Sequence, residues 1–142
     1  MPEQVATIEI VFLLQNCELF SAAGAEELLT LAHVTREEEF HDGDTVFAAG
    51  ESPNAFYFVV RGKVHLESRS KHIDEEAIEH QTFGVLSVLA GGPRAYKAVC
   101  EEDCLLLRVD ADDFYDFLSD EMEVARGILQ FFARQIPEKA VI

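Results

Sequence analysis

The chain has 142 residues, of which 49% are hydrophobic, and this length and composition fit one domain with a sizeable core. Acidic residues outnumber basic ones by 27 to 11, which gives a formal net charge of -16. A field of this sign repels nucleic acid and anionic membranes, so we expect contact with neither, although one basic side chain can still hold a small anion.

The first part of the chain is predicted to be helical. Residues 8–20, "IEIVFLLQNCELF", place apolar side chains on a broad face. Ser21 is expected to cap a second helix over 22–34. Glu26 and Glu27 fall in the first turns of that helix, where carboxylates interact favourably with the helix dipole.

The sequence changes character after residue 34. Short apolar runs are separated by Asp-Gly-Asp, Ala-Gly-Glu and Arg-Gly-Lys, a pattern typical of successive short strands. The clearest prediction is a hairpin in which residues 56–60 and 64–68 flank the turn Arg61–Gly62–Lys63.

The remaining elements complete an α+β domain. We predict a polar loop over 69–77, a strand over 77–83, a short helical turn over 85–90, strands over 95–102 and 104–110, and one or two helices over 111–136. Asp110 and Asp120 are expected as helix caps, and Pro137 ends the last helix. The expected fold is an eight-stranded antiparallel β-sandwich or jelly-roll barrel over about 35–110, flanked by helices over about 5–34 and 111–136.

The stretch "FGVLSVLAGGPRAY", residues 83–96, predicts a phosphate site. Gly84 lets the backbone approach a ligand closely, and a helix start near Leu86 would direct N–H groups toward an anion. Arg94 supplies a fork of donors that suits two phosphate oxygens. Two glycines before Pro93 would let the chain turn so that Arg94 comes back toward the helix start.

These residues resemble the phosphate-binding cassette of the cyclic nucleotide-binding domain, as in bacterial catabolite activators and regulatory subunits of protein kinase A. The family pattern is Phe-Gly-Glu, an apolar triplet, a variable stretch, and then Pro-Arg-Ala or Pro-Arg-Ser. The positions that match it with unchanged spacing are Phe83, Gly84, the run Leu86, Ser87, Val88 and Leu89, and then Pro93, Arg94 and Ala95. The likeness extends over about residues 10 to 135, including the entry helices, the first hairpins and the last strand.

The resemblance implies a regulatory domain of signal transduction rather than an enzyme. Its implied ligand is cyclic AMP (cAMP), cyclic GMP (cGMP) or a related phosphate compound, and no cofactor is required. Arg94 would pair with the cyclic phosphate. The chain is not expected to carry the basic helix-turn-helix of transcription regulators, so an attached or associated effector domain would give the output. A homodimer is among the assemblies left open.

The chain departs from the family pattern at several positions. Val85 replaces the glutamate that takes the ribose 2′-hydroxyl, and losing such a bond costs roughly 1.5–3 kcal/mol. The unpaired ligand hydroxyl adds to this cost, so we expect affinity to fall by about one to several decades. His80-Gln81 replaces the usual Gly-Asp before the cassette, so that turn must be built differently. Tyr96 replaces a small residue. Either Tyr96 and Ala98 exchange volumes in the core, or the Tyr96 ring lies in or near the pocket.

Two hypotheses of function stay open. In the first, the domain senses a cyclic nucleotide or related phosphate ligand through Arg94. In the second, it is a non-binding degenerate copy used for protein–protein contact, with its pocket empty or filled by Tyr96. The family's final helix closes over the base, but here only residues 138–142 follow Pro137, so a lid would come from this tail or from a partner.

Other functions find little support. No nucleophile lies in a recognisable catalytic setting, and no signal peptide is visible. Residues 7–15 are apolar but too short to cross a bilayer. Three cysteines, an odd number, suit a reducing compartment, so we expect a cytoplasmic protein. Metal binding is not expected, because no ligand-like spacing joins His41, His65, His72, His80, Cys100 and Cys104.

Overall fold

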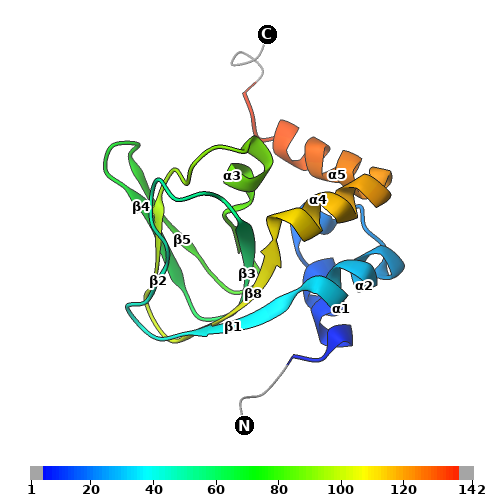
Figure 1. Cartoon of the computed structure of the whole chain (residues 1–142), viewed down its shortest axis with the longest axis horizontal. Coiled ribbons are helices and arrows are strands. Elements are labelled where there is room, and N and C mark those ends of the chain that lie inside the picture. The colour runs from blue at the N-terminus through cyan, green and yellow to red at the C-terminus, as the bar shows by residue number, and fades with distance from the viewer. Residues whose placement is uncertain (1–4, 138–142) are drawn as a thin grey trace.

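The computed structural model describes residues 5–137 of the chain. Within these residues, eight strands form two four-stranded antiparallel sheets, with the orders β1-β8-β3-β6 and β2-β7-β4-β5. The predicted eight-stranded jelly roll flanked by helices is therefore confirmed (Figure 1). The strands are β1 (Arg36–Phe40), β2 (Thr45–Phe47), β3 (Ala55–Arg61), β4 (Val64–Ser68), β5 (Ile73–Ala77), β6 (Thr82–Phe83), β7 (Lys97–Cys100) and β8 (Cys104–Asp110).

Helices cover the outer face of the β1-β8-β3-β6 sheet, on the side away from the second sheet (Figure 1). Among residues 5–137, no helix has the length and apolar character needed to cross a membrane, and α5 has only 12 residues. The helical elements are α1 (Thr7–Gln15), the 3-10 turn η1 (Glu18–Phe20), α2 (Ala25–Val34), α3 (Val85–Ala90), α4 (Ala111–Asp120) and α5 (Met122–Ala133).

Of the three predicted helix caps, only Asp110 lies at an N-cap position, and its side chain does not cap the helix. The helix α2 begins after Gly24 rather than after Ser21, and Gly24 makes no side-chain cap. Asp110 does precede α4, but its carboxylate accepts hydrogen bonds from Arg36 and Arg108 instead of capping the helix. The residue before α5 is Glu121, one position after the Asp120 that we expected.

Strand β5 lies where a polar loop was predicted. It pairs with β4 at the edge of its sheet, and its central side chains from Asp74 to Glu76 are exposed, so its polar composition hid its strand character. The strand expected over 77–83 shrinks to β6. It is preceded by His80, which takes a left-handed φ of 72° and stacks on Phe58 with ring centroids 6.1 Å apart. This histidine builds the turn for which the family uses Gly-Asp.

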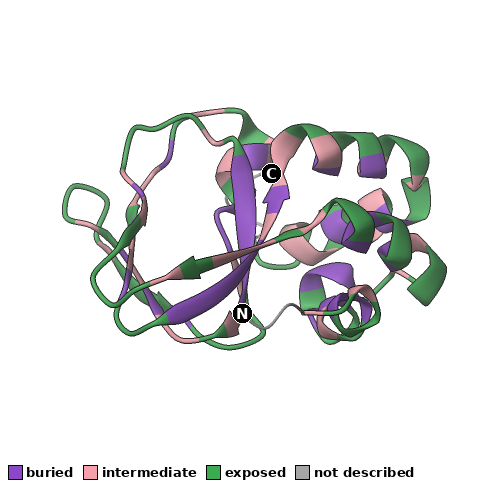
Figure 2. Cartoon of the chain, turned by 60° about the horizontal axis from the view of Figure 1, so that its bottom comes forward, coloured by how far each residue is buried: buried purple, intermediate pink, exposed green. Residues whose placement is uncertain are grey.

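Strands β3 and β8 are buried on both faces, because the domain has two cores that share one sheet (Figure 2). We call the layer between this sheet and the helices the helix-side core; it includes Leu14, Phe20, Leu28, Phe114 and Ile128. The roll core lies between the two sheets. Alternation along β3 sends Phe56 and Phe58 to the helix-side core and Tyr57 and Val59 to the roll core.

Helix α5 approaches the segment before α2 so closely at Gly127 that an added Cβ would lie 2.3 Å from the Ala22 Cβ. We expect Gly127→Ala to lower the free energy of unfolding by about 1–3 kcal/mol, since this overpacking outweighs the gain in helix propensity of about 1 kcal/mol. Urea denaturation measures the change. The double variant Ala22→Gly/Gly127→Ala should recover most of the loss, and a fully stable single variant would contradict this packing.

Candidate ligand site

Arg94 points into the protein rather than toward solvent. Its side chain is buried, and the residue is only 4% exposed. One terminal nitrogen, Nη1, donates to the Gly84 carbonyl at 2.7 Å, and the other, Nη2, donates to the Ala55 carbonyl. The guanidinium carbon lies 3.9 Å from the centroid of the Phe47 ring, a cation–π contact. Two strands and the cassette therefore hold this side chain.

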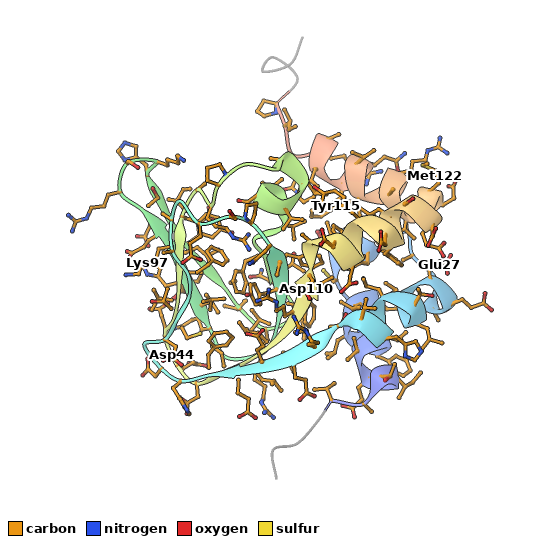
Figure 3. The ribbon with its side chains drawn as sticks, in the orientation of Figure 1. Glu27, Asp44, Lys97, Asp110, Tyr115 and Met122 are labelled. Atoms are coloured by element: carbon orange, nitrogen blue, oxygen red, sulfur yellow. The ribbon has the colours of Figure 1, made fainter. Side chains whose placement is uncertain are left out.

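The main chain fixes Arg94 in place. Its N–H donates to the Glu51 carbonyl at 2.8 Å, and its own carbonyl accepts the Gly50 N–H at 2.9 Å. The turn between β2 and β3 thus holds the loop that carries Arg94. Before this loop, α3 is followed by Gly91 in a left-handed conformation. Tyr115 of α4 donates a hydrogen bond from its hydroxyl to the Val88 carbonyl of α3 (Figure 3).

Both the N–H and the carbonyl of Gly84 form hydrogen bonds with side chains of the site. Its φ of +83° is left-handed, which favours glycine. Its N–H donates to the Tyr96 hydroxyl at 2.9 Å, while its carbonyl accepts the Arg94 bond. A Cβ at this position would lie 2.7 Å from Arg94 Nη1 and 3.4 Å from Phe47, so the close approach requires a glycine.

Four aromatic rings pack together in the roll core beside Arg94, which contacts one of them, Phe47, and we call them the aromatic set. The Phe47 centroid lies 5.6 Å from Tyr96, 6.0 Å from Phe83 and 6.3 Å from Tyr57. Tyr57 and Phe83 stack with centroids 5.4 Å apart. The Tyr96 ring thus lies in the roll core with its hydroxyl on the cassette. Burial raises the pKa of both Tyr96 and Tyr57, so both hydroxyls stay protonated at neutral pH.

Two arginines face the aromatic set, and their charges are balanced differently. Arg108 forms ion pairs with Asp110 at 2.7 Å and Glu38 at 3.7 Å, and it donates to the Tyr57 hydroxyl at 3.2 Å. Asp110 lies where β8 meets α4 (Figure 3). Arg94, by contrast, has no ion pair with any residue from 5 to 137, and its Nε atom is buried without a hydrogen-bond partner.

This imbalance has an electrostatic consequence. Burial lowers the pKa of the Arg94 guanidinium, which means that the charged form is held at a cost in solvation. Carbonyl dipoles, a ring face and the Glu51 carboxylate, which forms no ion pair with Arg94, compensate only part of this cost. The site therefore contains a positive charge that a small anion would stabilise.

The structure brings together only part of the predicted site. Phe83, Gly84, Arg94 and Tyr96 meet in the roll core. Val85 is buried in the helix-side core instead, so its side chain packs away from the aromatic set. The remaining predicted residues lie nearer the surface: Leu86 and Pro93 are exposed, and Ser87 and Ala95 are half-buried.

Sequence reasoning missed several neighbours of Arg94. Phe47, Ala55 and Tyr57 come from β2 and β3, and no local motif marks them. For Ala55 and Tyr57 the only signal was alternation along β3, which points both to one face, and Phe47 on β2 had no such signal. The tail residues 138–142, considered as a lid, lie outside the described residues. Between residues 5 and 137, no group of three His, Cys, Asp or Glu side chains is placed to hold a metal ion.

A jelly roll that carries such a cassette and a buried arginine defines a regulatory domain of the ligand-sensing class. The family model named "Cyclic nucleotide-binding domain" matches residues 37–121. The chain therefore belongs to the cyclic nucleotide-binding domain family.

Similar proteins include a transcriptional regulator and potassium channels. The CRP-like cAMP-activated global transcriptional regulator of Mycobacterium tuberculosis is 25% identical over 128 residues, which cover 87% of this chain. The match covers 57% of the mycobacterial protein, so this chain corresponds to little more than half of that relative.

Solved structures show the same fold. The N-terminal domain of a transcriptional regulator from Streptomyces coelicolor is 27% identical, with a TM-score of 0.74, over 87% of this chain and 89% of that one. The regulatory domain of Toxoplasma gondii PKA with cAMP is 18% identical, with a TM-score of 0.75, over 84% and 47%. At this low identity the second likeness concerns the fold alone.

Proposed function

We propose that this domain senses a small phosphate-bearing ligand, a cyclic nucleotide such as cAMP or cGMP or a related compound, with Arg94 as the anchor. One observation carries the proposal: Arg94 is a buried cation that has no carboxylate within 4.0 Å among the described residues. Arg108, beside the same aromatic set, has two carboxylates. A phosphate at Arg94 would supply the missing negative charge.

The ribose contributes less to binding than in the family pattern. Val85 offers no acceptor for a 2′-hydroxyl, and its side chain packs in the helix-side core. A ligand would then be held through its phosphate and its apolar faces. We expect an affinity about one to two decades below that of a site with the glutamate.

A second candidate, a non-binding copy that contacts another protein, is favoured by a different observation. Both terminal nitrogens of Arg94 and the N–H of Gly84 already have partners inside the protein. A ligand must compete with these bonds, and a pocket closed in this way could serve a purely structural role. The two candidates differ in whether any phosphate ligand displaces these internal hydrogen bonds.

Calorimetric titration with cAMP and cGMP tests the first candidate, with Arg94→Lys as the matched variant. Lysine keeps the positive charge but loses the planar fork, so we expect saturable binding that becomes at least about 10-fold weaker in the variant. Equal binding by both proteins would place the ligand elsewhere. No heat from the wild-type protein at millimolar ligand would favour the second candidate.

The output of the sensor belongs to the same proposal. An attached or associated effector domain would receive the signal, since the chain spans only 57% of the regulator that it resembles. With a net charge of -16, direct contact with nucleic acid by this chain stays disfavoured.

A further inference from the structure

Tyr96 holds a position that a ligand oxygen would use. Its hydroxyl oxygen accepts the N–H of Gly84 at 2.9 Å, and the carbonyl of the same residue accepts Arg94 Nη1 at 2.7 Å. A phosphate that pairs with Arg94 in this place would therefore lie against the Tyr96 hydroxyl. The N–H of a glycine with positive φ is a donor well suited to an anionic oxygen.

The tyrosine is held firmly in this position. Its ring packs on Phe47, which also contacts the Arg94 guanidinium, so one ring supports both side chains. A phenol oxygen is a neutral acceptor, and a neutral acceptor is weaker than a phosphate oxygen at the same donor. A ligand can therefore displace it, but only by breaking an existing bond.

We propose that the Tyr96 hydroxyl is an internal competitor of the ligand, occupying the Gly84 N–H in the free protein and lowering the affinity for phosphate compounds. This inference rests on the proposed function, because it needs a ligand that binds at Arg94. It makes Tyr96 a determinant of affinity rather than a passive replacement for a small core residue. The ring packs on Phe47 and supports the site, whereas the hydroxyl competes with the ligand for the Gly84 N–H.

The test is Tyr96→Phe, which keeps the ring and removes the competing oxygen. In calorimetric titrations with cAMP and with inorganic phosphate, we expect the dissociation constant for cAMP to fall by about 3- to 10-fold. The matched control is Tyr115→Phe, which also removes a partly buried hydroxyl hydrogen bond, but one in which Tyr115 of α4 donates to the Val88 carbonyl of α3. Its dissociation constant should change by less than about twofold.

A second measurement does not need a ligand. In the free protein, amide hydrogen exchange at Gly84 should become faster in Tyr96→Phe, because the N–H loses its partner. Exchange that does not change would overturn the inference even if the protein binds cAMP.

The titrations separate this inference from the proposed function. Tighter binding in Tyr96→Phe, or binding that only this variant shows, supports both. If the wild-type protein binds cAMP as tightly as Tyr96→Phe or more tightly, competition by the Tyr96 hydroxyl is ruled out and the proposed sensor function stands. If neither protein binds cAMP or inorganic phosphate at millimolar concentration, both proposals are wrong. An effect of the same size in Tyr115→Phe would show a general loosening and overturn the role of Tyr96.

Discussion

Arg94→Ala should lower the free energy of unfolding by about 3 kcal/mol and remove measurable ligand binding. The change deletes two charge-assisted hydrogen bonds, each contributing about 1.5–3 kcal/mol, and leaves the carbonyls of Gly84 and Ala55 without this partner. Relief of the buried charge offsets part of this loss. Denaturation with guanidinium chloride, followed by circular dichroism, measures the free energy of unfolding, and the cAMP titration measures the binding.

The matched control is Arg126→Ala, which removes a surface arginine whose side chain is 68% exposed and pairs with Glu123 only at 3.9 Å. It should cost less than about 0.5 kcal/mol. If Arg94→Ala proves as stable as this control, the bonds to Gly84 and Ala55 do not hold the site together. Full ligand affinity without Arg94 would rule out its role as the anchor.

Gly84→Ala should be the second most damaging change. An alanine at a φ of +83° costs about 1–2 kcal/mol in backbone strain, and its Cβ would meet Arg94 Nη1 at 2.7 Å. The guanidinium must then leave the Gly84 carbonyl, so its hydrogen bond is lost as well. We expect a total loss of about 3 kcal/mol in thermal or denaturant unfolding, together with weaker binding of cAMP by at least about 10-fold.

Gly91→Ala separates strain from contact. This glycine also has a left-handed φ, +73°, but an added Cβ would have no atom within 4 Å. It should therefore cost only the backbone strain of about 1–2 kcal/mol. Equal losses for Gly84→Ala and Gly91→Ala would mean that the close approach of Arg94 to Gly84 contributes nothing to stability.

The fold could be predicted from the sequence where local signals and burial agree. The apolar strands on either side of Gly62 form close to where they were predicted, as β3 and β4. The predicted hairpin between them is wrong, however, because β3 pairs with β6 and β8, whereas β4 pairs with β5 and β7 in the other sheet. Local signals failed where the tertiary setting decides: β5 is polar because it lies at a sheet edge, and Ser21 does not cap α2 because the helix begins after Gly24.

The site was only half visible in the sequence. Gly84 and Arg94 belong to one short motif, so the pattern placed them together correctly. Their partners Phe47 and Ala55 are distant in the chain and meet them only after the two sheets close on each other. The direction of Val85 could not be read either, because the residue stands at the junction between the cassette and the helix-side core.

The shared sheet has a consequence for how the domain comes apart. Strands β3 and β8 supply side chains to the helix-side core and to the roll core at alternate positions. Because the two cores share these strands, we expect the loss of one core to destabilise the other. Unfolding is therefore expected to be a single cooperative transition, as in most domains of this size. A ligand that binds at Arg94 should then raise the melting temperature of the whole domain, including helices that it does not contact.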